Sequence, residues 1–380
     1  MSAAGSTRSP EYIPALDGLR GIAVLLVLAV HSEHPISHKA WLSWGWIGVD
    51  LFFVLSGFLI TRILLNARAS ERYFKSFYVR RILRIWPVYF SFLLFVYACA
   101  RTGLVREHIS GVGWASLLTF TQNFCLAFRG WDSIVIWLGP TWSLGIEEQF
   151  YLVWPWIVKR ANDQMLQRIC MTVLLVSPFI RAVVSQLVSR DDGPMLLTFS
   201  HFDGICMGGL LAILFSQQTI SSKRSIAWIE RLAIPAGLAF ILIDRWSVQP
   251  YYDALKFSFL ALLFGGIVAL CVSQSSSTIS RTLEAFLGFA PLRYIGKISY
   301  CLYIIHFAAF SIAGSHFSQN LLMGIPGYSS KGWFVVADGW LLSIAIASLS
   351  WYLFESPILR LKRHFAASAE SPKTLAASQS

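Results

Sequence analysis

An arginine and a histidine lie eleven residues apart in the first apolar stretch of the chain, where ionisable side chains are costly to bury. Residues 16–31 read LDGLRGIAVLLVLAVH, so Arg20 and His31 are separated by nearly three helical turns and face one side of a helix, about 16 Å apart along its axis. Neutral imidazole accepts a proton near pH 7, as a general base must. The spacing makes His31 a candidate base. The competing interpretation is a hydrogen bond inside a helix bundle and an Asp17–Arg20 ion pair.

A pair of arginines follows at the start of a later apolar stretch. In YVRRILRIWP (residues 78–87), Arg81 and Arg84 are three residues apart and therefore adjacent on one helical face. The planar guanidinium fork suits bidentate phosphate binding. This pair predicts a phosphate site at the membrane boundary, while ordinary anchoring by positive charges explains the other cations nearby.

Two adjacent carboxylates interrupt the segment TWSLGIEEQFY (residues 141–151). On a helix Glu147 and Glu148 point about 100° apart, so they are expected to do different jobs. One carboxylate is expected to face the bundle interior, where it orients a base or pairs with an arginine; a structural ion pair fits equally well. Three further polar sites are interpreted as packing contacts, namely Arg181, His201 with Asp203, and His306.

These residues must be positioned by membrane helices. The 380 residues are 56% hydrophobic and only 13% charged, about half the charge of an average soluble domain. The net charge of +11 is divided between apolar runs rather than gathered in one patch, which argues against nucleic-acid binding. The six cysteines stand singly, without a CxxC or Cys/His cluster, so no metal site is predicted.

Apolar windows of about 20 residues predict ten spans. They lie near 16–34, 45–62, 84–101, 139–158, 169–188, 197–216, 229–243, 257–274, 298–315 and 336–354. With the N-terminus inside, 22 of the 31 Lys and Arg residues fall on the cytoplasmic side, as the positive-inside rule requires. The prediction is an all-α, polytopic membrane helix bundle of about ten transmembrane helices with both termini cytoplasmic. Uncharged residues 109–128 are interpreted as re-entrant or interfacial, because a further span would invert this bias.

Taken in order, the motifs resemble the acyltransferase-3 family of integral membrane O-acyltransferases over residues 12–358. The resemblance is carried by IPALDGLRGIAVLLVLAVH (13–31), GVDLFFVLSGFLIT (48–61), FYVRRILRIWPVY (77–89), WSLGIEEQFYLVWP (142–155), ISYCLYIIHF (298–307) and FESP (354–357). The expected organisation is a polar tail over 1–14, one membrane acyltransferase domain over 15–358, and a basic, then disordered tail over 359–380.

The resemblance implies an enzyme that moves an acyl group, often acetyl, from acyl-coenzyme A to a hydroxyl. It also implies a multi-pass location in a bacterial inner membrane and a cell-surface or exported glycan, or a lipid-linked saccharide, as acceptor. Acyl-coenzyme A would be the donor substrate, with no resident cofactor. The family's motifs fall on Arg20 and His31, on Arg81 and Arg84, and on Glu147.

The corresponding hypothesis is direct transfer without a covalent enzyme intermediate. Arg20, Arg81 and Arg84 would hold the coenzyme phosphates, His31 would deprotonate the acceptor hydroxyl, and Glu147 would orient or pair within the site. Two alternatives stay open: a small acceptor such as a macrolide, and a non-enzymatic transporter or flippase. The transporter would need an inverted repeat, and none is evident in the sequence.

Overall fold

The computed structural model describes residues 12–32, 43–105, 109–188, 193–246, 251–273, 278–314 and 333–362. Over these ranges the chain is built from helices and contains no strand, which confirms the all-α prediction. The two predicted tails lie for the most part outside the described residues.

A long helix occupies each of the ten predicted spans. These helices are α1 (Pro14–His31), α2 (Ile47–Ala67), α3 (Tyr73–Arg101), α6 (Thr141–Arg160), α7 (Asp163–Leu187), α9 (Phe202–Gln217), α10 (Ile220–Trp246), α11 (Tyr251–Val272), α13 (Ala290–Ala313) and α15 (Trp333–Ser350). Within the described ranges, eight segments are long and apolar enough to cross a membrane. The remaining two are α9, which is apolar but has only 16 residues, and α6, which carries two carboxylates in its middle.

Shorter elements connect the long helices. They are α4 (Gly111–Leu118), α5 (Gln122–Arg129), α8 (Gly193–Leu196), α12 (Thr278–Leu287) and α16 (Ser356–Arg360), which follows a π-helical turn at Trp351–Glu355.

Helix α3 starts earlier than the apolar window predicts. It begins at Tyr73 instead of residue 84 and runs for 29 residues, because hydropathy marks only the part of a helix that lies in the bilayer. The basic segment before the apolar window, residues 73–83, contains no glycine or proline, the two residues that are least favourable inside a helix. As a result Arg81 and Arg84 lie on a helix, as their spacing requires.

Residues 109–128 do not form one spanning helix. They give two helices of eight residues each, α4 and α5, each about 12 Å long and too short to cross a bilayer. The break falls at Phe120, whose φ of 55° lies in the left-handed region. Neither helix is long enough to span by itself, which agrees with the interpretation of this segment as a non-spanning piece; that interpretation stays a prediction.

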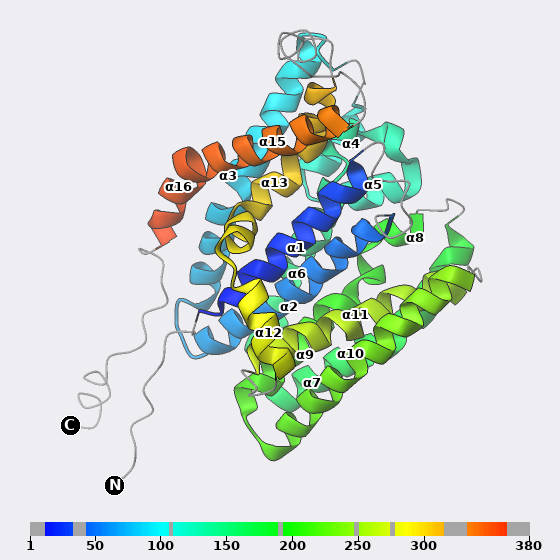
Figure 1. Cartoon of the computed structure of the whole chain (residues 1–380), viewed down its shortest axis with the longest axis vertical. Coiled ribbons are helices and arrows are strands. Elements are labelled where there is room, and N and C mark those ends of the chain that lie inside the picture. Colours follow the sequence, from blue (N-terminus) through cyan, green and yellow to red (C-terminus); the bar gives the residue numbers. More distant parts are fainter. Residues whose placement is uncertain are drawn as a thin grey trace, which may run out of the picture.

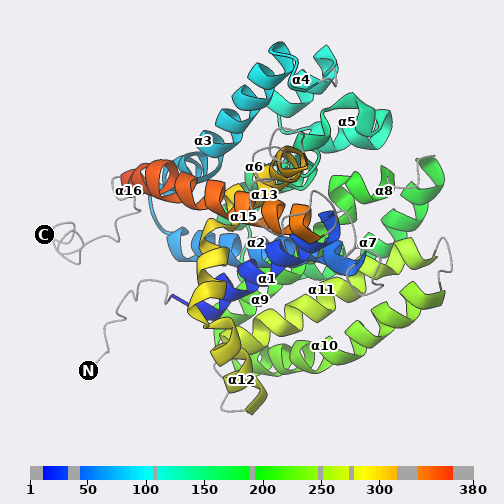
Figure 2. The same cartoon turned by 45° about the horizontal axis from the view of Figure 1, so that its top comes forward.

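Close helix contacts hold the centre of the bundle. Figure 1 shows α1 and α2 in the middle, with α10 and α11 side by side along one flank, and Figure 2 shows the same arrangement from another side. A Cβ added at Gly57 of α2 would collide with the backbone oxygen of Ile205 in α9, and one added at Gly296 of α13 would collide with that of Asp17 in α1. Small residues at such contacts let membrane helices approach closely. These contacts fix α13 against α1 and α9 against α2.

Candidate active site

Four of the five predicted site residues line one cavity. Arg20 from α1, Arg81 and Arg84 from α3, and Glu147 from α6 all border a cavity of about 310 Å³, which we call the basic cavity. The residues come from three helices that are distant in the sequence. A cavity of roughly this size is suited to a substrate-sized molecule.

Arg20 is held in the wall of the basic cavity by helix α13. Its Nη2 donates a hydrogen bond to Ser299 Oγ at 3.2 Å. Its Nε is buried and has no hydrogen-bond partner among the described residues. Arg20 thus contributes a partly buried cation that is held by a side-chain hydrogen bond and lines the cavity, where an anionic ligand would interact favourably with it.

Arg81 and Arg84 leave their charges available. The Arg81 guanidinium lies over the rings of Phe77 and Tyr151, 5.8 and 5.6 Å from their centroids, which positions the cation without neutralising it. Neither arginine forms an ion pair with a carboxylate in the ranges that the structure describes. The basic cavity therefore carries three guanidinium groups near one another.

The two adjacent carboxylates face different surroundings, as their spacing predicts. Glu147 borders the basic cavity and accepts a hydrogen bond from Tyr151 Oη at 3.0 Å. Tyr151 Oη is in turn 2.5 Å from Ser56 Oγ. Glu148 instead accepts a 3.5 Å hydrogen bond from the indole of Trp86. Of the two carboxylates, Glu147 is the one that borders the basic cavity, and together with Asp17, which also lines it, it balances part of the arginine charge.

His31, the fifth predicted residue, borders a different cavity. This second cavity of about 80 Å³, the aromatic cavity, is lined by His31, Asp50, His201 and Tyr303 and by several aromatic side chains, namely Trp46, Trp131, Trp142, Phe257 and Phe307. The two cavities share Val49 and Tyr303 as wall residues. The Tyr303 hydroxyl at this boundary is 2.7 Å from Ser143 Oγ.

Hydrogen bonds determine which nitrogen of His31 carries the proton. His306 Nδ1 lies 2.6 Å from the backbone oxygen of Tyr303 and must donate, because a carbonyl only accepts. In a neutral His306 the Nε2 atom is then an acceptor, and it lies 3.1 Å from His31 Nδ1. His31 Nδ1 therefore carries the proton, which leaves Nε2 unprotonated. This is the tautomer that a general base needs.

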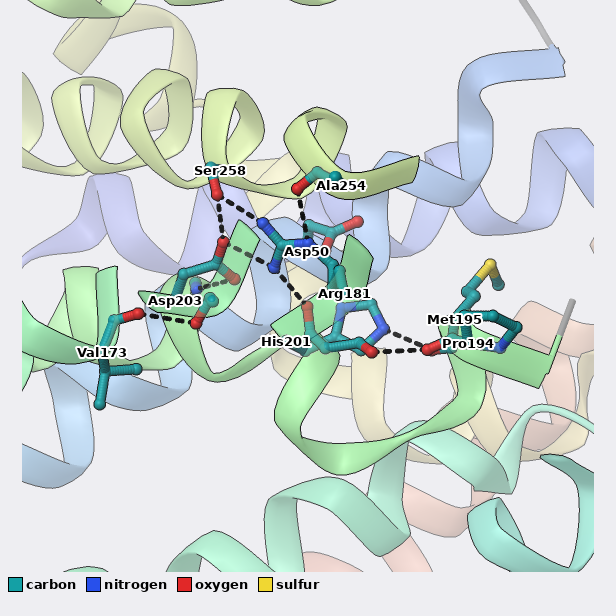
Figure 3. Close-up of polar contacts among 12 residues, drawn as sticks. Asp50, Val173, Arg181, Pro194, Met195, His201, Asp203, Ala254 and Ser258 are labelled. Atoms are coloured by element: carbon teal, nitrogen blue, oxygen red, sulfur yellow. Dashed lines mark hydrogen bonds and ion pairs between the residues drawn. The ribbon is translucent and has the colours of Figure 1, made fainter. Parts of the chain in front are cut away.

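Two buried polar pairs lie in this region, and one of them, His201 with Asp50, lines the aromatic cavity (Figure 3). Arg181 Nη1 pairs with Asp203 Oδ2 at 2.9 Å, and His201 Nδ1 lies 3.1 Å from Asp50 Oδ1. The sequence grouped His201 with Asp203, whereas the structure joins each of them to a different helix. It also singled out neither Asp50 nor the proximity of His306 to His31. A carboxylate inside the apolar run at 48–61 was the signal available for Asp50.

The chain was compared with known proteins. A family model described as an acyltransferase domain matches residues 13–355. The O-acetyltransferase OatA of Staphylococcus aureus is 28% identical over 96% of this chain and 60% of its own length. The peptidoglycan O-acetyltransferase OatA of Listeria monocytogenes is 30% identical over 79% of this chain and 49% of its own length.

A third relative is the putative peptidoglycan O-acetyltransferase YrhL of Bacillus subtilis, which is 28% identical over 93% of this chain and 56% of its own length. The chain thus spans less than two thirds of the length of these relatives. No solved structure matches it. Because the family model covers nearly all of the chain, and the helices and motifs agree with it, this chain belongs to the acyltransferase family that the model describes.

Proposed function

We propose that this membrane protein transfers an acetyl group from acetyl-coenzyme A, bound in the basic cavity, to a hydroxyl of a glycan in the aromatic cavity. One observation carries the proposal: the cavity with three arginines and the cavity with His31 share the walls formed by Val49 and Tyr303. The names of the similar proteins, which are O-acetyltransferases, two of them named for peptidoglycan, support an acetyl group and a glycan acceptor.

The basic cavity is suited to the charged end of the donor. Arg20, Arg81 and Arg84, which all line this cavity, would bind the phosphates. Glu147 would keep the guanidinium groups in place through its negative charge and its bond to Tyr151. The acyl-pantetheine arm would extend along α1 toward His31, a rise of about 16 Å for eleven residues.

The chemical step needs only one proton carrier. His31 Nε2 would accept the proton as the acceptor oxygen attacks the thioester carbonyl, so that the new C–O bond forms and the C–S bond breaks. The same proton then passes from His31 to the departing thiolate, which leaves as the free thiol. No covalent enzyme intermediate is required, and the imidazole returns to its starting tautomer.

The test measures ester-linked acetyl groups on surface glycans by mass spectrometry. Cells would carry the wild-type chain, His31→Ala or Arg84→Ala, each checked for equal protein level. A matched control is Arg68→Ala, which removes a guanidinium that pairs with Asp163 outside both cavities. We expect both site variants to lose acetylation and the control to retain it.

Full acetylation in the His31→Ala cells would refute the proposed role of His31. Unchanged glycans in all cells, together with acetylation of a small added acceptor such as a macrolide, would move the proposal to that substrate. Export of a substrate without consumption of acetyl-coenzyme A would instead indicate a transporter.

A further inference from the structure

Asp50 presents an unused carboxylate oxygen to the aromatic cavity. Asp50 lies in α2 and lines the same cavity as His31. Its Oδ1 is 3.1 Å from His201 Nδ1. The other oxygen, Oδ2, has no hydrogen-bond partner among the described residues and is not among the enclosed polar atoms. It therefore faces the space that the acceptor would enter.

The acceptor character of this oxygen does not depend on where the proton of the pair lies. His201 Nε2 is 2.7 Å from the backbone oxygen of Met195 and must donate to it. The short contact between His201 Nδ1 and Asp50 Oδ1 then holds one further proton. Whether that proton lies on nitrogen or on Oδ1, Asp50 Oδ2 carries none and accepts hydrogen bonds.

A network of buried bonds keeps this pair in place (Figure 3). Arg181 Nη1 donates to the backbone oxygen of Ser200, next to His201, at 2.8 Å, and its Nε donates to that of Ala254 at 2.8 Å. Arg181 also pairs with Asp203. Because Arg181 is almost completely buried, at 1% exposure, the backbone before His201 is fixed and Asp50 is presented in one orientation.

Aromatic side chains make up a large part of the remaining cavity wall, beside Val49, Ile136, Gly139, Pro140 and Met195. Trp46, Trp131 and Trp142 border it, and Trp142 lies 5.4 Å from the His201 ring between centroids. Such a wall offers flat apolar surfaces with one fixed hydrogen-bond acceptor among them. A pyranose ring matches this pattern, since its C–H faces are apolar and its hydroxyl edge donates hydrogen bonds.

We infer that Asp50, backed by His201, is the hydroxyl-binding group of a saccharide site in the aromatic cavity, with the tryptophans covering the faces of the sugar ring. This inference rests on the proposed function and adds the residues that would select the acceptor. Asp50 would bind a hydroxyl next to the one that His31 deprotonates, so it is a binding residue with no part in the proton transfer.

The test uses the purified full chain in lipid nanodiscs, with acetyl-coenzyme A and a tetramer of N-acetylglucosamine as the acceptor probe. Initial rates of thiol release and of acetylated sugar give separate KM values for donor and acceptor. We expect Asp50→Ala to raise the KM for the tetramer about ten- to a hundred-fold, the usual effect of losing a hydrogen bond to a charged group. The KM for acetyl-coenzyme A should stay as in the wild type.

Trp131→Ala provides a second variant outside the ion pair, on the short turn Trp131–Ser133, and should also raise the KM for the tetramer. The matched controls are Asp163→Ala, whose carboxylate pairs with Arg68 away from both cavities, and Trp228→Ala, whose side chain is exposed on α10. Both controls should keep the wild-type KM for the tetramer. If Asp50→Ala does not fold, the comparison of Trp131→Ala with Trp228→Ala decides.

An unchanged KM for the tetramer in Asp50→Ala and Trp131→Ala would overturn the inference while leaving the proposed function intact. Wild-type acetylation of a macrolide but not of the tetramer would overturn the saccharide assignment alone. A wild-type chain that neither binds nor consumes acetyl-coenzyme A would instead refute the proposed function itself.

Discussion

Replacing His306 tests whether a second histidine determines the protonation of His31. His306 is buried in α13 and accepts, through Nε2, the hydrogen bond from His31 Nδ1 at 3.1 Å. In His306→Leu the His31 ring loses this partner and keeps its backbone hydrogen bond to Val27. The alternative tautomer, which cannot act as the base through Nε2, then becomes more populated. His306→Gln retains an acceptor oxygen at the same distance along the side chain, so it should preserve most of the effect.

The expected size follows from the cost of a lost hydrogen-bond partner. Losing one hydrogen bond, with the backbone bond to Val27 kept, costs about 0.5–1.5 kcal/mol, and each 1.36 kcal/mol is tenfold in rate. We therefore expect kcat of His306→Leu to fall about 2- to 12-fold, and that of His306→Gln to fall less. The KM for acetyl-coenzyme A should not change, because His306 does not border the basic cavity.

The assay is steady-state acetyl transfer by the purified chain, measured as thiol release over a range of pH. A structural role for His306 would lower kcat equally in both variants and reduce thermal stability in parallel. Wild-type kcat and an unchanged pH profile in His306→Leu would refute the tautomer reasoning, since His31 would then act as a base without its partner.

Three further results are expected. Arg84→Ala should raise the KM for acetyl-coenzyme A about ten- to a hundred-fold, as charged hydrogen bonds to phosphate are lost, with the acceptor KM as the internal control. Burial, and after it the nearby arginines with Arg84 foremost, lowers the pKa of Lys362 to about 6. Since a bound anion favours the protonated amine, the affinity for acetyl-coenzyme A should increase as the pH falls from 8 toward 6. The increase should be larger in the wild type than in Lys362→Met, and comparing the two cancels the titration of the donor phosphate. Gly296→Ala should lower the midpoint of thermal unfolding, because its added Cβ meets the Asp17 backbone oxygen; an unchanged midpoint would contradict the close α1–α13 contact.

Much of the fold could be predicted from the sequence, because bilayer thickness imposes a length on every apolar run. The ten windows each coincide with a helix, although α3 extends well before its window because helix formation does not stop at the membrane surface. The interpretation of residues 109–128 as a piece that does not span rested on charge bias alone, and nothing local in the sequence marks the break at Phe120, where φ is positive.

The candidate site was predictable where its residues share one helix. The eleven-residue spacing of Arg20 and His31 and the three-residue spacing of Arg81 and Arg84 are helix periodicities that a sequence displays directly. The partners of these residues were not predictable, because they depend on contacts between helices. His306 was interpreted as a packing residue, yet it lies 3.1 Å from the ring of His31.

The same limit applies to the buried carboxylates. Asp203 and His201 are two residues apart, which suggests a pair, but Asp203 bonds to Arg181 of α7 and His201 to Asp50 of α2. Sequence proximity does not identify these partners, because both residues lie at the start of α9, where the chain turns and successive side chains meet different helices. The packing of α9 against α2 and α7 is what pairs Asp203 with Arg181 and His201 with Asp50.

One helix pair, α1 and α13, positions both ends of the proposed reaction path. Asp17 lies against Gly296, Arg20 bonds to Ser299 and His31 bonds to His306, so the two helices run in the same direction. A slip of one residue between them would move these atoms by about 1.5 Å, enough to break hydrogen bonds of 3.2 and 3.1 Å. Because the Gly296 contact prevents such a slip, the donor-binding arginine and the candidate base are set by the same packing, and a variant that loosens this pair should impair donor binding and proton transfer together.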